Sequence, residues 1–380
     1  MADAGREHMP KLASMLETLQ NPSSRCETKR TKVTVFANTA STYSLNRYTA
    51  ELAANLPPAV EAKAVYFQPV SSGIQKQIDR YWRYMRLARK EQGDYNVIVS
   101  EGCAYLLLAL PKERTICVCH DVHSLAYAGP KDLHHRLYDL RYRASLALLP
   151  TAKFVVTVSD ATRRELLRYC RSIPEEKTVT IHNGLERRWK PVTNSCTISD
   201  FRNQHQLCGK RVILHVGEDV FYKNVPAVLR AFAQLPDPDL VLLKIGGLTQ
   251  ATQGLVDLLG IRSRLRHLTQ VSDDDLVAAY NTSDMLVFPS LSEGFGWPPL
   301  EAMACGCPVI ASNCASILET CEDACLYVHP ADFKAIAAMI ARVLREENVR
   351  VGLRERGLQQ AAKFSWKNSA SEFLRLFQQP

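Results

Sequence analysis

Glu293 and Glu301 are separated by seven residues and flank a turn that contains Gly294 and Gly296. Carboxylates accept hydrogen bonds from sugar and ribose hydroxyls, and they stabilise positive charge that develops in a reaction. The two glycines permit a tight turn and a close approach of the backbone to a ligand. The spacing therefore predicts that both carboxylates face one ligand from different sides.

The residues around this turn predict a strand, a loop and a helix. The strand ends near Pro289, and Pro298 and Pro299 suit the first turn of a helix, where a missing N–H is tolerated. Gly306 fits the C-terminal cap of that helix. Open N–H groups at the helix start would form an anion site suited to a diphosphate. A helix-start carboxylate followed by a solvated one is the plainer alternative, and the glycines, prolines and flanking elements argue against it.

Short apolar segments alternate with helical patterns along the chain, which favours a parallel α/β architecture. A polar stretch at 185–210 is typical of an interdomain linker. We therefore expect one Rossmann-like domain at 32–190 and a second at 208–363, with ligands in the cleft between the carboxyl ends of their sheets. The expected strands are 32–37, 62–67, 97–100, 115–120, 154–159 and 179–181, then 212–216, 240–245, 267–268, 285–289, 309–311 and 325–328.

Composition narrows the class of protein. The 380 residues are 46% hydrophobic and 23% charged, as in a soluble enzyme, and no apolar run is long enough to span a bilayer. The N-terminus lacks a signal-peptide pattern, so we expect a cytoplasmic protein. After Ala37 the sequence lacks Gly-x-Gly-x-x-Gly, which argues against NAD or FAD.

Twelve cysteines are present, and several of them lie in or beside apolar runs. Two pairs have only one residue between their members, unlike the spacing of zinc ribbons. We expect reduced, mostly buried thiols, with a zinc site as the alternative. The cysteines expected in the core are Cys103, Cys117, Cys119, Cys305 and Cys307.

Positive charge is concentrated in the first half of the chain. Residues 1–190 carry 29 Lys and Arg against 19 Asp and Glu, whereas residues 191–380 carry 18 against 20. This imbalance suggests an anionic partner for the first half. Nucleic acid is one candidate, although no recognised nucleic-acid motif is present, and a membrane surface or a phosphorylated lipid acceptor fits as well. Residues 78–90 combine five basic residues with three aromatic ones, as in an interfacial helix or a packing helix with a solvated basic side.

The stretch from Ser272 through Pro330 resembles the retaining glycosyltransferases of family 4, which have the GT-B fold and a two-glutamate signature. The resemblance covers most of the chain from about residue 32. It implies an α/β protein with two Rossmann-like domains facing across a cleft and a helix in residues 365–380 that packs back on the first domain. The segments that carry it are Glu293 to Glu301, Phe288-Pro-Ser, Gly306-Cys-Pro-Val-Ile-Ala-Ser and, more weakly, Thr157 to Leu166, Ile181-His-Asn-Gly-Leu and His120-Asp121.

The resemblance also implies roles for individual residues. Glu293 would contact the hydroxyls of the donor sugar and steady the transition state, and Glu301 would bind the ribose. Lys223 would neutralise the leaving diphosphate, with Asn224 beside it. His120 would lie near the donor sugar and the acceptor. The backbone amides of the turn, at Gly294, Phe295 and Gly296, would face the donor.

The sequence departs from the family near Lys223, where Glu218 and Tyr222 stand at the positions of a usual arginine. Half of the diphosphate clamp is then missing or comes from elsewhere, with Arg163 or Arg164 as candidates. The first loop, Thr39 to Ser44, also lacks the usual glycine pair. The acidic run 273–275 is better explained as a helix start than as a metal site, and the resemblance implies no cofactor and no essential metal.

These observations predict a retaining transfer of a hexose from a nucleotide diphosphate sugar to a hydroxyl of a glycan or lipid-linked acceptor. Guanosine-diphosphate mannose is one candidate donor. The expected location is the cytoplasm or the inner face of a membrane, without nucleic-acid binding. The alternatives are a GT-B sugar-nucleotide epimerase, a phosphorylase, and a non-catalytic subunit that binds sugar nucleotides.

Overall fold

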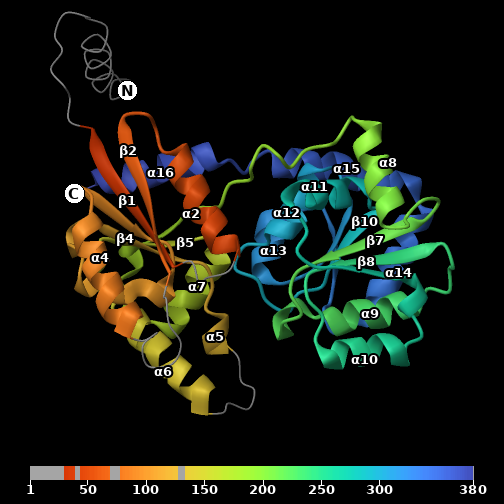
Figure 1. Cartoon of the computed structure of the whole chain (residues 1–380), viewed down its shortest axis with the longest axis horizontal. Coiled ribbons are helices and arrows are strands. Elements are labelled where there is room, and N and C mark those ends of the chain that lie inside the picture. Colours follow the sequence, from red (N-terminus) through yellow and green to blue (C-terminus); the bar gives the residue numbers. More distant parts are fainter. Residues whose placement is uncertain (1–29, 39–42, 69–77, 127–132, 380) are drawn as a thin grey trace, which may run out of the picture.

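The computed structural model describes residues 30–38, 43–68, 78–126 and 133–379. These residues contain two parallel six-stranded sheets, which lie side by side in Figure 1. The first sheet has the order β2 (Val60–Phe67), β1 (Thr31–Asn38), β3 (Tyr95–Ile98), β4 (Thr115–Cys119), β5 (Phe154–Thr157), β6 (Thr178–Thr180). The second has the order β12 (Leu326–Val328), β11 (Val309–Ser312), β10 (Met285–Phe288), β7 (Arg211–Val216), β8 (Leu240–Ile245), β9 (Leu265–Leu268).

Helices cover both faces of each sheet, so central strands are buried on both sides and form continuous apolar runs. All residues of β4, β8, β10 and β11 are buried. The helices of the first half are α2 (Tyr43–Asn55), η1 (Asp79–Arg83), α4 (Tyr84–Glu91), η2 (Glu101–Leu108), η3 (Lys112–Arg114), α5 (His123–Ala126), α6 (Leu133–Leu146), η4 (Leu149–Thr151), α7 (Asp160–Tyr169) and η5 (Glu175–Lys177).

The second half follows the same alternation of strands and helices. Its helices are α8 (Ser195–Gln204), η6 (Phe221–Lys223), α9 (Val225–Ala233), α10 (Gln250–Leu258), η7 (Arg262–Arg264), α11 (Asp273–Thr282), α12 (Trp297–Ala304), α13 (Ala315–Cys321), α14 (Phe333–Arg345), α15 (Glu347–Ala361) and α16 (Trp366–Gln378). The predicted two-domain α/β architecture is thus confirmed, and the strand ranges agree with the expected ones within about two residues. The predicted domain limits at 32–190 and 208–363 remain predictions.

The last helix returns to the first domain, as expected. In Figure 1 the dark blue α16 lies at the top of the first domain, where it packs against α2. Phe377 stacks on Tyr95 at the start of β3, with ring centroids 4.8 Å apart. Lys153 Nζ donates to the carbonyl oxygen of Phe377 at 3.2 Å. The chain therefore crosses between the domains twice.

The stretch at 185–210 is more ordered than the linker that we expected. It contains α8, whose N-cap Asn194 accepts from the backbone N–H of Cys196 at 3.0 Å. α8 packs on α11, and Phe201 and Leu207 are buried in the core. The polar composition hid this helix because few large apolar side chains anchor it.

The cysteines named above are buried as expected, and the eleven cysteines in the described part of the chain are unpaired. Residues 273–275 form the first turn of α11, where Ser272 Oγ accepts from the N–H of Asp275. The predicted helix start is therefore confirmed. No helix in the described ranges has both the length and the apolar character that crossing a bilayer requires.

Candidate active site

Lys223 and Glu293 meet at the carboxyl ends of two neighbouring strands. Lys223 closes η6 after β7, and Glu293 lies in the loop after β10, which pairs with β7. Lys223 Nζ lies 2.7 Å from Glu293 Oε1, and their side chains are only 15% and 9% exposed. The ammonium also lies 4.8 Å from the ring centroid of Phe288. The structure thus brings together the two groups predicted to act on the sugar and on the diphosphate.

The glycine turn contacts the first domain. A Cβ on Gly294 would lie 1.9 Å from the carbonyl oxygen of His120, so only glycine fits at this position. The Gly294 carbonyl accepts from Ser159 Oγ at 2.6 Å and from Thr162 Oγ1 at 3.0 Å. The predicted close approach therefore occurs, but the described partner is the other domain. An approach to a ligand stays a prediction.

The helix that follows this turn begins as predicted. Gly296, with φ of +96°, precedes Trp297, and Pro298 lies in the first turn of α12. Gly306, with φ of +76°, follows its end. Pro298 and Pro299 carry no N–H, so any donors to an anion at this helix start come from other residues. Binding of a diphosphate at this helix start stays a prediction.

Glu301 lies in α12 and is bound from two directions. Its Oε1 contacts Nη1 of Arg47, which lies on α2 of the first domain, and its Oε2 accepts from the Tyr280 hydroxyl at 2.8 Å. The Glu301 side chain is 4% exposed. Arg47 also forms a two-bond pair with Glu186. Sequence reasoning missed Arg47, because a single arginine in a helix gives no signal by itself.

His120 lies at the end of β4, at the edge of the first sheet that faces the glycine turn. Its Nε2 lies 2.8 Å from the Val99 carbonyl oxygen, and its ring packs edge-on against Tyr48 at 4.8 Å. Because a carbonyl only accepts, Nε2 carries the hydrogen and Nδ1 is the acceptor. Burial lowers the pKa of His120 to about 4, so the ring is uncharged at neutral pH.

Asn224 and Phe295 hold the loops of the site in place. Asn224 adopts a left-handed conformation with φ of 55°, and its Nδ2 donates to the carbonyls of Pro289 and Pro330 at 3.0 and 2.7 Å. The Phe295 side chain is buried, and its carbonyl accepts from Thr320 Oγ1 at 3.1 Å. The Asn224 side chain therefore braces the loops after β10 and β12, the Phe295 carbonyl holds the turn to α13, and a direct contact of either residue with a donor stays a prediction.

Arg163, one of the two candidates for the missing arginine, is held on its own domain, and the role of Arg164 stays a prediction. Arg163 Nε donates to the Thr178 carbonyl at 3.0 Å, and Arg163 Nη2 lies 3.0 Å from Glu175 Oε1. These bonds hold Arg163 on its own domain. Glu218 accepts from the Gly247 N–H at 2.9 Å, so it braces the loop after β8.

Lys244 is a further cation at this end of the second sheet. It lies in β8, is fully buried, and its Nζ donates to the carbonyls of Gly217, Ile245 and Gly246 at 2.6, 2.9 and 3.1 Å. Burial lowers its pKa to about 8. Sequence reasoning read this lysine as part of a strand, although a lysine within an apolar run was a usable signal.

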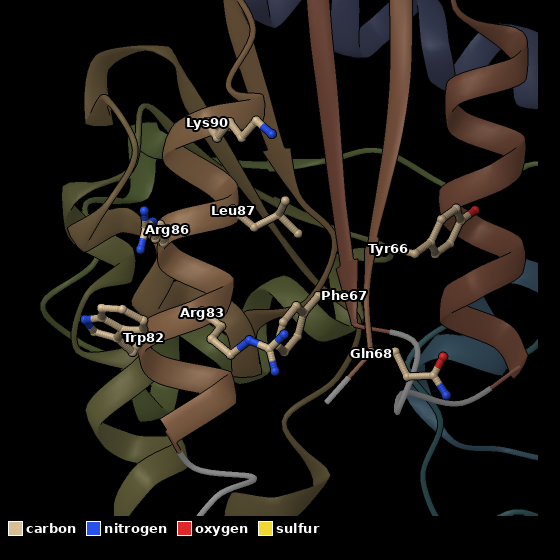
Figure 2. A pocket seen from close by; sticks show the side chains of 8 residues that line it. All are labelled: Tyr66, Phe67, Gln68, Trp82, Arg83, Arg86, Leu87 and Lys90. Carbon is tan, nitrogen blue, oxygen red and sulfur yellow. The ribbon is translucent and has the colours of Figure 1, made fainter. Parts of the chain in front are cut away.

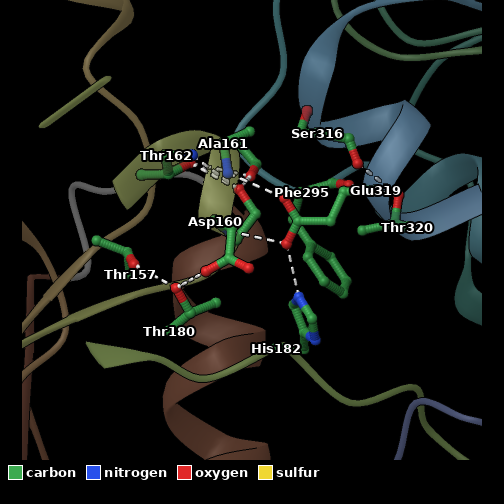
Figure 3. A network of polar contacts seen from close by, with 12 residues as sticks. Thr157, Asp160, Ala161, Thr162, Thr180, His182, Phe295, Ser316, Glu319 and Thr320 are labelled. Atoms are coloured by element: carbon green, nitrogen blue, oxygen red, sulfur yellow. Dashed lines mark hydrogen bonds and ion pairs between the residues drawn. The ribbon is translucent and has the colours of Figure 1, made fainter. Parts of the chain in front are cut away.

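A second set of contacts joins the two domains beside the glycine turn (Figure 3). Glu319 on α13 accepts from the backbone N–H groups of Asp160 and Ala161 at 2.7 and 2.9 Å, at the start of α7. Its Oε1 also lies 2.7 Å from His182 Nε2. The bond to Glu319 raises the pKa of His182. An acidic group at a helix N-terminus is favourable, so this contact stabilises the packing of one domain on the other.

Comparison with known proteins agrees with this geometry. Residues 24–188 match the model of Glycosyltransferase Family 4, and residues 198–360 match that of Glycosyl transferases group 1. Over 273 residues the chain is 31% identical to O-antigen chain mannosyltransferase B of Escherichia coli, covering 70% of each protein. The chain belongs to glycosyltransferase family 4. The predicted family and enzyme class, that of a hexosyltransferase, are thereby confirmed.

Other family members and solved structures support the same fold. The serotype-specific mannosyltransferase WbdA of Escherichia coli is 32% identical over 285 residues, which are 70% of this chain but 34% of WbdA. The crystal structure of Anabaena HepE with UDP and glucose aligns with a TM-score of 0.76 at 16% identity, covering 91% of this chain and 98% of HepE. WaaG, a glycosyltransferase of lipopolysaccharide biosynthesis, aligns with a TM-score of 0.72 at 15% identity, covering 92% and 100%. These alignments confirm the predicted GT-B fold.

The chemistry available at the site is that of charge stabilisation. Buried cations and carboxylates stand at the ends of neighbouring parallel strands, where ligands bind in this architecture. Within the ranges that the structure describes, no three His, Cys, Asp or Glu side chains are grouped so that they could hold a metal ion.

Proposed function

We propose that this family member is a retaining enzyme that transfers a hexosyl group from a nucleotide diphosphate sugar to a hydroxyl of a glycan or lipid-linked acceptor. The ion pair of Lys223 and Glu293 at the ends of β7 and β10 carries this proposal. Mannose is the favoured sugar because the relatives named above are mannosyltransferases. HepE, which shares the fold, was crystallised with UDP-glucose, which supports a sugar nucleotide as donor.

In the proposed reaction, the bond between the anomeric carbon and the diphosphate oxygen breaks, and the acceptor oxygen attacks from the same face. The acceptor hydroxyl passes its proton to the departing phosphate oxygen. Glu293 accepts hydrogen bonds from the sugar hydroxyls and stabilises positive charge on the ring. Lys223 turns to the diphosphate and offsets the charge that collects there.

His120 and the contacts between the domains have supporting roles in this proposal. The uncharged His120 ring offers Nδ1 as an acceptor to a sugar hydroxyl. Contacts at Gly294 and Glu319 close the first domain over the glycine turn and exclude water, which limits hydrolysis of the donor.

A panel of nucleotide sugars in a thermal-shift assay, followed by mass spectrometry of transfer products, tests the proposal. Glu293→Ala and Lys223→Met should each lower kcat by about a hundredfold or more, because each removes stabilisation of transition-state charge. Glu347→Ala is a matched control, since Glu347 is an exposed carboxylate on α15 that pairs only with Arg350 among the contacts described. Full activity of the Glu293 or Lys223 variant would refute the assigned roles.

The same assay separates the alternatives. Glu218 stands where the family usually has a second cation. This difference is the observation that favours the alternative of a non-catalytic subunit that binds sugar nucleotides. Donor binding without turnover over a broad acceptor panel would favour that subunit. A changed sugar nucleotide formed without acceptor would reveal an epimerase.

We also propose that the first domain contacts an anionic membrane surface through η1 and α4. A pocket between this helical segment and β2 is lined by Arg83, Arg86 and Lys90 on the helical side and by Tyr66, Phe67 and Gln68 on the strand side (Figure 2). Trp82 is 61% exposed, and the Arg86 guanidinium lies 5.6 Å from its ring centroid. Basic groups beside an exposed tryptophan suit a lipid headgroup layer.

Packing explains why this segment has two sides. Tyr84 is fully buried and stacks on Phe67, with centroids 4.5 Å apart. Neighbouring α6 also exposes Leu137 and Leu140, and both α4 and α6 pack against η2. The buried side holds the segment on the domain, and the opposite side exposes Trp82 and basic residues.

Co-sedimentation with vesicles that contain phosphatidylglycerol tests the membrane contact. Binding should fall with added salt and should fall in the Trp82→Ala and Arg86→Gln variants. Arg342→Gln on α14 of the second domain is the control and should bind as the unaltered protein does. Equal binding to neutral vesicles, or none to anionic ones, would end the proposal.

A further inference from the structure

Arg47 reaches from the first domain into the second. Its Nε and Nη2 bind both oxygens of Glu186, and its Nη1 contacts Glu301. The rings of Trp189 and Trp297 lie against the guanidinium, with centroids 5.1 and 4.7 Å from Cζ. The arginine side chain is 9% exposed, so the contact is enclosed by protein.

The carboxylate of Glu301 is bound on both oxygens in this arrangement and is almost closed to solvent. Arg47 occupies one oxygen, the Tyr280 hydroxyl occupies the other, and 4% of the side chain is exposed. Tyr280 lies on α11 of the same domain as Glu301 and is fully buried. Arg47 lies on the opposite domain, so it is the partner that leaves when the domains move apart.

We infer that Arg47 occupies the place of the donor's ribose hydroxyls on Glu301, and that nucleotide binding must displace it. This inference rests on the proposed function, in which Glu301 binds the ribose. After the Arg47 guanidinium leaves Glu301, it remains paired with Glu186, so its charge is not left buried without a partner. The nucleotide therefore competes with a contact between domains, and the competition lowers donor affinity.

Calorimetric titration with UDP and with GDP tests the competition in Arg47→Met. In this variant the nucleotide no longer has to break the hydrogen bond between Arg47 and Glu301. We therefore expect the Kd of the nucleotide to fall about tenfold. A residue that merely orients Glu301 would have the opposite effect, because its removal would weaken binding. Unchanged or weaker binding to Arg47→Met would overturn the inference. It would also be overturned if neither UDP nor GDP bound to the unaltered protein or to the variant.

Two further variants keep the test decisive if Arg47→Met folds poorly. Arg47→Met with Glu186→Gln removes the carboxylate that the first change leaves unpaired, while the glutamine oxygen still accepts from Trp189 Nε1. This double variant should show the same gain in affinity. Arg342→Met is the matched control, because Arg342 on α14 pairs with Glu346 and should leave affinity unchanged. An equal gain in the control would overturn the inference.

The Glu301→Gln variant distinguishes a failure of the inference about Arg47 from a failure of the proposed role of Glu301 in binding the ribose. Weaker nucleotide binding in Glu301→Gln together with no gain in Arg47→Met would overturn the competition and leave the ribose role standing. Unchanged binding in Glu301→Gln would instead count against the ribose role itself.

Discussion

Three cations near the carboxyl ends of β7, β8 and β10 are neutralised in different ways. Lys223 pairs with Glu293, Arg47 pairs with Glu186 and Glu301, and Lys244 donates only to backbone carbonyls. Lys223 could be predicted because it stands in a segment that resembles a known family. Arg47 and Lys244 could not, because their importance depends on partners that only the fold supplies.

Lys244 should make turnover sensitive to alkaline pH. Its ammonium has three N–H donors for three carbonyls, and the neutral amine has two. Since its pKa is about 8, turnover should fall as pH rises through about 8, because the Gly217 loop beside Lys223 loses a donor. Turnover of Lys244→Met should be lower and should lack this decline. A pH profile of kcat and KM measures both.

Unfolding does not account for such a decline. The pKa of Lys244 is lower in the fold than the ordinary value of 10.5, so the free energy of unfolding from this group rises between about pH 8 and 10.5. Lys334→Met, at an exposed position on α14, is the control and should keep the decline. The same decline in Lys244→Met would contradict the assignment.

The turn between β10 and α12 is the element whose local structure was most predictable. Strand end, glycines, prolines and capping glycine each impose a conformation on their own neighbours, so the sequence specifies the turn locally. The partner of Gly294 was not predictable, because His120 lies 174 positions earlier in the sequence. Likewise α8 was missed, since its polar sequence has Phe201 as its main anchor.

Gly294→Ala should push the domains apart at the glycine turn. The added Cβ would lie 1.9 Å from the His120 carbonyl, which is backbone and cannot rotate away. We expect a loss of about 1–3 kcal/mol in the free energy of unfolding, a larger radius of gyration by small-angle X-ray scattering, and reduced turnover.

Gly254 provides the matched glycine. It lies in α10, and a Cβ there would meet no atom within 4 Å. Gly254→Ala should therefore stabilise the protein by about 0.5–1 kcal/mol and leave the radius of gyration unchanged. An unchanged radius and turnover in Gly294→Ala would show that the turn tolerates a side chain.

At the scale of the whole molecule, the site is assembled from both domains. Glu301, Gly294 and Glu319 each touch a residue of the first domain that is more than 130 positions away in the sequence. Local patterns determine helices and strands, whereas the placement of one domain on the other depends on pairs such as these. This is why the fold was predictable in outline and the contacts across the cleft were not.

The Glu319 contact should make domain closure depend on pH. The pKa of His182 is raised. Its stabilisation of the contact between the domains is therefore complete below the ordinary pKa of 6.5 and is lost as pH rises through the raised pKa. Burial alone would raise the pKa of Glu319, but its bonds to His182 and two amides lower it, so its contribution is complete above 4.5 and is lost in stronger acid. Closure should thus be firmest between about pH 4.5 and 6.5.

Titration of His182 by NMR and small-angle scattering at several pH values measures this dependence. In Glu319→Gln the pKa of His182 should fall towards its ordinary value, and the radius of gyration should no longer change across neutral pH. Glu347→Gln should behave as the unaltered protein does. A His182 pKa that is the same in Glu319→Gln would show that another group sets it.

The two crossings between the domains lie against each other. Leu185 and Ser365 form a β-bridge, the Leu185 N–H lies 3.4 Å from the Phe364 carbonyl oxygen, and a Cβ on Gly184 would lie 2.1 Å from the backbone nitrogen of Trp366. Paired crossings oppose twisting of one domain against the other and leave rotation about a single axis through this pair. A protease that cut either crossing would leave the other as a covalent link between the domains. The domains would still rotate about this axis, but they would no longer resist twisting against each other.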